Sequence, residues 1–124
     1  MYNNSPEYFG PGYWIAWHLK AYKADTYIKK TEVSRSIVID VSNIPCKTCK
    51  HDALGYMRDN QLISFVENNK DPLSLFKWTV KFHNFVNKKL DKEEVSLEQA
   101  IEMWNGNSIC LEEDCGQSLK IKGM

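Results

Sequence analysis

Two cysteines three positions apart give this chain its clearest potential for chemistry. Cys46 and Cys49 follow Pro45, and we expect them to open a helix, because proline has no N–H to lose in a first helical turn. Residues at this spacing share one face, so their sulfurs can close into a disulfide. The positive end of the helix dipole, together with Lys47 and Lys50, favours a thiolate. The motif therefore predicts a redox-active dithiol or half of a zinc site.

A second cysteine pair, Cys110 and Cys115, lies near the C-terminus with three acidic residues between its sulfurs. The acidic neighbours make it a poorer nucleophile than the first pair. It is either a structural disulfide that pins the C-terminus or a shuttle pair that passes electrons by thiol–disulfide exchange, and both interpretations stay open. The two pairs together could instead bind zinc, although the second spacing lies at the edge of the usual range. A zinc-binding helical interaction module is therefore the alternative function.

The segment 78–90 carries the second informative group of polar side chains. His83 and Asn87 stand four apart and share a helix face, with Asn84 and Lys88 beside them. A buried imidazole or amide needs a hydrogen-bond partner, because an unpaired buried polar group is costly. A lone histidine is more often a hydrogen-bonded core residue than a ligand-binding one. Gathered within two helical turns, these side chains suit a polar ligand with phosphates or heterocycle edges.

The composition predicts one folded domain over residues 1–124. Apolar residues make up 43% of the chain, and 16 basic residues balance 16 acidic ones, which does not favour nucleic acid or an acidic membrane as partner. No apolar run approaches the about 20 residues that span a bilayer. The N-terminus lacks the charged start and apolar core of a signal peptide. We therefore expect a soluble chain located in the cytoplasm.

Apolar periodicity predicts an all-α fold, a four-helix bundle plus a short fifth helix. The expected helices cover about 11–24, 26–42, 46–59, 72–90 and 96–104. Residues 60–71 are expected to form a polar connection, Asp71 to cap the helix that follows, and Ser96 to open the last helix in a capping box. The second helix is expected to bury a stripe made of Ile28, Val33, Ile37, Val38 and Val41. No βαβ pattern supports a thioredoxin-like oxidoreductase.

These motifs together resemble the Erv/ALR family of FAD-linked sulfhydryl oxidases, particularly its short viral members. The matching residues follow in family order and spacing: Gly10, Trp14 and His18; Pro45, Cys46 and Cys49; Trp78, then His83-Asn84-x-Val86-Asn87-x-Lys89-Leu90; Lys92; and Trp104. Many cellular members carry a structural disulfide whose first cysteine would stand at Leu97, and this chain lacks it.

The resemblance implies where a cofactor would bind. FAD would lie noncovalently between the helices, within a core of about residues 9–106, followed by a tail over 107–124 that holds the second cysteine pair. No resident metal is implied. The implied cofactor-binding residues are Gly10, Trp14, His18, Trp78, His83, Asn84, Asn87, Lys89, Leu90, Lys92 and Trp104. Lys89 and Lys92 suit the pyrophosphate, whose charge a cation offsets.

The resemblance also implies the reaction and the partners. Cys46 would exchange with a dithiol of a protein substrate or with the Cys110/Cys115 pair, and Cys49 would pass the electrons to FAD. Oxygen would then be reduced to hydrogen peroxide. Family members are commonly homodimers through their first two helices, and Trp17 and Tyr22 are candidates for exposure there. A viral member would act in the host cytoplasm or the virion.

Overall fold

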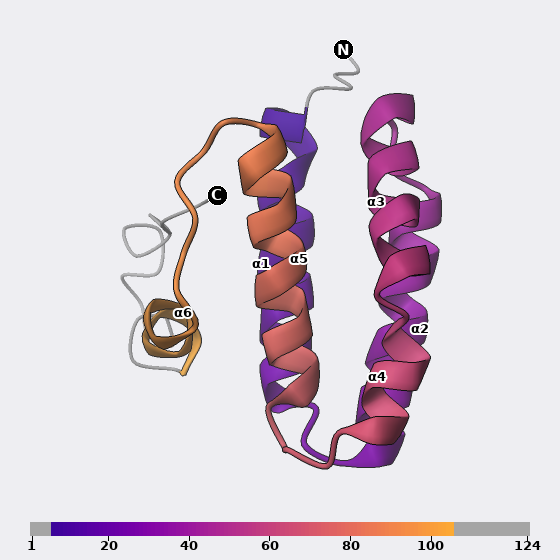
Figure 1. The fold of residues 1–124 in the computed structure, drawn as a ribbon, viewed down its shortest axis with the longest axis vertical. Coiled ribbons are helices and arrows are strands. Elements are labelled where there is room, and N and C mark those ends of the chain that lie inside the picture. The colour runs from indigo at the N-terminus through magenta and orange to yellow at the C-terminus, as the bar shows by residue number, and fades with distance from the viewer. Residues whose placement is uncertain (1–5, 106–124) are drawn as a thin grey trace, which may run out of the picture.

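The computed structural model describes residues 6–105, and this range contains helices and no strand. Its six helices are α1 (Pro6–Lys23), α2 (Tyr27–Ser42), α3 (Lys47–Asp59), α4 (Leu62–Asn68), α5 (Ser74–Lys89) and α6 (Leu97–Trp104). In Figure 1, α1 and α5 run side by side, α2 runs along α3 and α4, and α6 is seen along its own axis, across the others. The predicted all-α bundle with a short last helix is confirmed.

The helix α4 is the element that the sequence pattern did not predict. The polar connection expected over 60–71 is wrong, because Leu62 and Val66 stand four apart, are both buried, and form the inner face of a seven-residue helix. The helix packs against α2 and α5. Its remaining residues are mostly exposed and polar, so its amphipathic pattern covers less than two turns and is hard to recognise in the sequence.

Helix α1 begins at Pro6, earlier than the expected start at residue 11, and continues through Pro11. Proline is favoured in the first turn of a helix, whereas an interior proline removes one backbone hydrogen bond. The helix persists because aromatic rings four residues apart pack along it. Phe9 contacts Tyr13 at 6.0 Å between ring centroids, and Tyr13 stacks on Trp17 at 5.2 Å.

The start of α5 also differs from the prediction. The helix begins at Ser74, and Asp71 does not cap it, because the carboxylate accepts from the Leu73 N–H at 3.0 Å within the preceding turn. Asp71 also pairs with Lys77, and that side-chain hydrogen bond is the main cause that lowers the pKa of Asp71 below its ordinary value. The capping box of α6, between Ser96 and Gln99, is confirmed.

Helix α2 presents a different face to the core from the one predicted. Ile37 and Val41 are buried as expected, but Ile28 is 69% exposed and Val38 is 41% exposed. Lys30 and Ser34 take the inner positions instead. Lys30 can be buried because its ammonium donates to the Asp71 carbonyl at 2.6 Å, which joins α2 to the turn before α5.

Helices α1 and α2 are joined by Trp17. The expected exposure of Trp17 is wrong: the side chain is 2% exposed, and its indole N–H donates to the Asp40 carboxylate at 2.8 Å. A buried indole needs such a partner, and Asp40 supplies it from the facing helix. Tyr22 is partly buried and packs edge-on against Phe76 of α5.

Candidate functional site

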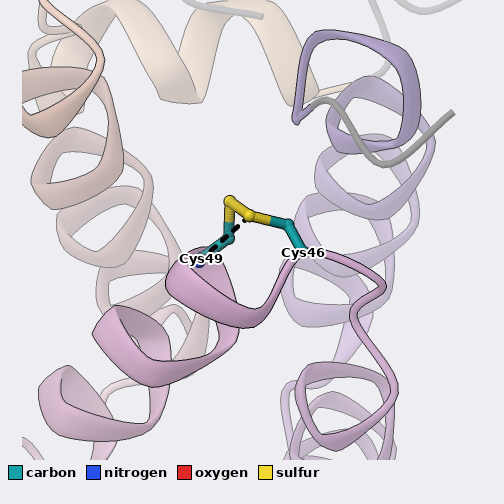
Figure 2. The surroundings of a disulfide bond; sticks show 2 residues. All are labelled: Cys46 and Cys49. Atoms are coloured by element: carbon teal, nitrogen blue, oxygen red, sulfur yellow. Dashed lines mark hydrogen bonds between the residues drawn. A yellow bond between two sulfur atoms is a disulfide. The ribbon is translucent and has the colours of Figure 1, made fainter.

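The Cys46/Cys49 disulfide sits at the N-terminus of α3 (Figure 2). Cys46 has extended backbone dihedrals and is the N-cap residue, and its sulfur accepts the Cys49 N–H at 3.2 Å. The two Cα atoms lie 5.2 Å apart. The predicted helix opening and the predicted disulfide are both confirmed. Unpaired N–H groups at this helix end stabilise negative charge on a sulfur that is released from the disulfide.

A pocket opens between α1, α3 and α5, and Cys49 forms part of its wall. The empty space of about 750 Å³ at this pocket includes open solvent, so the pocket is a cleft that opens to the surface. Cys46 does not line this pocket. Most of the wall is apolar or aromatic, and it includes Gly10, Tyr13, Trp14, Ile44, Cys49, Asp52, Ala53, Phe82, His83, Phe85, Asn87, Lys89, Leu90 and Lys92. The two bonded cysteines therefore differ in position, because only Cys49 lines the pocket.

Aromatic rings of three helices pack together at the pocket wall and behind it. His83 of α5 stacks on Trp14 of α1, with ring centroids 4.0 Å apart and planes inclined by 7°. His18 lies behind them, with its Nε2 at 2.8 Å from Nδ1 of His83, and Trp104 of α6 packs on His18. The structure thus brings together four of the residues that the sequence marked, of which Trp14 and His83 reach the pocket wall.

The His18 imidazole is buried, and burial is the main cause that lowers its pKa well below the ordinary value of 6.5, with the charge of His83 as the second cause. Charging His18 in the native state would require a cation without water around it. At neutral pH His18 is therefore uncharged and acts through one N–H and one lone pair.

This lowered pKa predicts a loss of stability in mild acid. Below pH 6.5 the unfolded chain binds a proton at His18 that the native chain does not, so the free energy of unfolding falls as the pH falls. For one proton, the free energy of unfolding changes by at most about 1.4 kcal/mol per pH unit. Denaturant titrations at pH 7.5 and 5.5 measure it, with a variant of the exposed His51, His51→Gln, as the matched control. An equal stability at both values would contradict the prediction.

The two asparagines of the segment 78–90 have different surroundings. Asn84 donates to the Val95 carbonyl at 2.7 Å and accepts the Val95 N–H at 2.8 Å, so it ties α5 to the segment before α6 and does not line the pocket. Asn87 is 2% exposed and lines the pocket, and its side-chain NH₂ has no hydrogen-bond partner among the described residues. Such a buried donor is costly unless a ligand acceptor meets it.

The end of α5 places two cations at the pocket. Asp91 has a φ of 56°, its N–H bonds to the Lys88 carbonyl at 3.3 Å, and the Lys92 N–H bonds to the Asn87 carbonyl at 2.7 Å. These bonds form a Schellman motif, which reverses the chain direction directly after the helix. Lys89 and Lys92 consequently both line the pocket, from the two sides of the turn.

The positive φ of Asp91 predicts opposite effects of two substitutions. Asp91→Gly is expected to raise the free energy of unfolding by up to about 1 kcal/mol, because glycine has no Cβ to clash in this conformation. Asp91→Val is expected to lower it by about 1–3 kcal/mol, because a β-branched residue rarely adopts a positive φ. Thermal and denaturant unfolding of both variants measure the change in the free energy of unfolding. A change of the same sign in both variants would contradict the positive φ of Asp91.

Trp78 is placed away from the pocket. Its indole N–H donates to the Asn60 carbonyl at 2.9 Å, which anchors α5 to the end of α3. Sequence reasoning did not single out Phe82 or Phe85, although the helical pattern places both beside His83. It also missed Asp52, which stands three residues after Cys49 and lines the pocket on α3. Cys110 and Cys115 lie outside the described residues.

Residues 6–105 contain no group of three or more His, Cys, Asp or Glu side chains arranged to hold a metal ion. Across the same range, none of the helices combines the length and the apolar character needed to cross a membrane.

Comparison with known proteins gives consistent similarities. The sequence model described as the Erv1 / Alr family matches residues 11–105. A protein named FAD-linked sulfhydryl oxidase from African swine fever virus is 35% identical over 92 residues, which cover 72% of this chain and 73% of the relative. A second isolate of that virus matches to the same extent. A putative FAD-linked sulfhydryl oxidase of Invertebrate iridescent virus 6 is 30% identical over 102 residues, covering 74% of this chain and 87% of the relative.

Proposed function

Because the chain belongs to the Erv1 / Alr family, we propose that it is an FAD-linked sulfhydryl oxidase that forms disulfides in protein substrates. The observation that carries the proposal is the position of Cys49. This sulfur belongs to an exchangeable disulfide, and Cys49 also lines the pocket between α1, α3 and α5. A dithiol can thereby reach substrate at the helix start and a bound cofactor inside the bundle.

The residues of the pocket fit FAD. The stacked Trp14 and His83 rings offer a flat surface for a heterocycle, and the unpartnered Asn87 amide offers a donor for one of its acceptor atoms. Lys89 and Lys92 offset the charge of a pyrophosphate. His18 and Trp104 support the stack from behind, whereas Asn84 and Trp78 hold the framework. When bound, FAD takes two electrons from a dithiol and gives them to O₂.

The chain supplies the thiol chemistry of this reaction. A substrate thiolate attacks the Cys46 sulfur, which breaks the Cys46–Cys49 bond, forms a mixed disulfide and leaves Cys49 as a thiolate at the pocket wall. A second substrate thiolate then resolves the mixed disulfide and leaves Cys46 reduced. The α3 N-terminus stabilises the released sulfur charge. With cofactor and oxygen, two thiols and O₂ give one disulfide and H₂O₂.

The test uses the full chain as purified. We expect a yellow protein with a flavin absorption band that consumes one O₂ and releases one H₂O₂ for each disulfide formed in a dithiol substrate. A colourless protein with bound zinc would contradict the proposal and support the zinc-binding interaction module.

The Cys110/Cys115 pair is proposed either as a shuttle to protein substrates or as a structural disulfide. Since the relatives are viral, the host cytoplasm or the virion is the proposed site of action.

The chain is also proposed to form a homodimer through the outer face of α2. Ile28 is 69% exposed and Ile39 is 62% exposed, and Tyr27 and Val38 lie on the same side. A second copy would cover these residues, whose exposure is costly in a monomer. We expect sedimentation to give twice the chain mass of 14.4 kDa, and Ile28→Glu with Ile39→Glu to give the monomer. Ile63→Glu on α4 is the control, and a wild-type monomer would contradict this proposal.

A further inference from the structure

A chain of hydrogen bonds links α5 to the histidine pair behind the pocket. The Thr79 hydroxyl lies 2.7 Å from the Phe76 carbonyl and 3.0 Å from Nδ1 of His18. Nε2 of His18 lies 2.8 Å from Nδ1 of His83. Thr79 is fully buried, and His18 and His83 are 2% and 6% exposed. Three consecutive polar contacts therefore run through the core and end on a ring that lines the pocket.

The chemistry of these groups fixes the direction of every bond. A carbonyl oxygen can only accept, so the single hydroxyl proton of Thr79 points to Phe76. The Thr79 oxygen must then accept from His18, which places the His18 proton on Nδ1. His18 is uncharged at neutral pH because burial lowers its pKa, so its Nε2 carries a lone pair. That lone pair accepts from His83, which places a proton on Nδ1 of His83. In the uncharged form of His83, which carries a single ring proton, Nε2 is then an acceptor.

We propose that Thr79 is a positioning residue, which sets the tautomers of His18 and His83 and so presents Nε2 of His83 as a hydrogen-bond acceptor to the cofactor pocket. The part that concerns the cofactor rests on the proposed FAD binding. FAD carries donor groups, its amine, imide and hydroxyl hydrogens, and the fixed tautomer selects one of these over an acceptor. Without the Thr79 hydroxyl, His18 would move its proton to Nε2 and donate to His83, and Nε2 of His83 would become a donor.

A plain structural role for Thr79 is the competing explanation, because helical threonines commonly bond back to their own helix. Thr31 provides the matched case. Its hydroxyl donates to the Tyr27 carbonyl at 2.9 Å on α2, away from the histidines. Thr79→Val and Thr31→Val each remove one such hydroxyl. An effect that both variants share comes from losing a helix hydroxyl, whereas an effect of Thr79→Val alone comes from the histidine tautomers. Thr79→Ser keeps the hydroxyl and serves as the conservative variant.

The first measurement is a nitrogen-15 NMR spectrum of the histidine rings of the full chain at pH 8. The chain has three histidines, and the exposed His51 serves as internal reference. We expect protons on Nδ1 of both His18 and His83 in the wild type and in Thr79→Ser, and on Nε2 of both in Thr79→Val. A wild-type His18 with its proton on Nε2 would overturn the proposal even if Thr79→Val does not fold. Unchanged tautomers in Thr79→Val would overturn it as well.

The second measurement is the affinity of the flavin-free chain for FAD, with the unfolding free energy of each variant measured in parallel. Thr79→Val is expected to bind FAD about 10- to 100-fold more weakly, because a donor then faces a donor. Thr79→Ser and Thr31→Val are expected to bind as the wild type does. Equal weakening by Thr31→Val and Thr79→Val would overturn the proposal. If the wild type binds no FAD, the proposed function is wrong. The NMR measurement of the histidine tautomers then still tests the proposed chain of hydrogen bonds, because it needs no FAD.

Discussion

Cys49→Ser is expected to abolish oxidation of dithiol substrates, with kcat lowered at least about 10³-fold, while FAD stays bound. The loss follows from chemistry, because a serine hydroxyl cannot form the disulfide through which electrons leave the substrate. FAD binding is retained because Cys49 is one residue of a large pocket wall and serine is no bulkier. Oxygen consumption with a small dithiol measures the first effect, and the flavin absorption of the purified protein measures the second.

The control for this experiment is the second cysteine pair. Cys110→Ser combined with Cys115→Ser is expected to leave the oxidation of a small dithiol near the wild-type rate, because such a substrate reaches Cys46 directly. Protein substrates are expected to be oxidised more slowly if the pair is a shuttle. Retained turnover by Cys49→Ser would contradict the assigned reaction. An equal loss on small and protein substrates in the double variant would indicate a structural bridge.

The sequence predicted the parts of this site whose cause is local. The opening of α3 at Cys46 follows from Pro45 and the cysteine spacing alone, and the capping box at Ser96 follows from a pattern of four residues. Both depend on backbone groups within a few positions. The bundle followed from apolar periodicity over long stretches, whereas the short helix α4 offered too few turns for its period to be recognised.

The errors concern contacts between helices. The inner face of α2 holds Lys30 because a carbonyl from the turn before α5 meets its ammonium. Trp17 is buried because Asp40 stands opposite it on α2. Periodicity assigns a lysine to the outside and leaves a tryptophan free to point either way, and only the partner on another element decides. Thr79 was overlooked for the same reason, since its importance derives from His18 on α1.

Asn84 and Asn87 belong to one sequence motif, but the pattern alone does not show which of them finds a partner on another segment. Their different surroundings give the second prediction. Asn87→Leu is expected to weaken FAD binding about 10- to 100-fold, because the buried amide donor that a cofactor acceptor would meet is removed. The flavin-free chain is expected to change its free energy of unfolding by less than about 1 kcal/mol. Its amide NH₂ has no partner among the described residues, so removing that donor breaks no bond there.

Asn84→Leu is the matched control, and it is expected to behave in the opposite way. Its amide holds both backbone groups of the buried Val95, so the substitution leaves an N–H and a carbonyl unpaired. The free energy of unfolding should fall by about 2–3 kcal/mol. Denaturant unfolding without FAD, followed by FAD titration under conditions where each variant is folded, separates the two quantities. If Asn87→Leu destabilises the flavin-free chain as strongly and leaves FAD affinity intact, Asn87 belongs to the framework, and the cofactor must find its donors on other residues of the pocket.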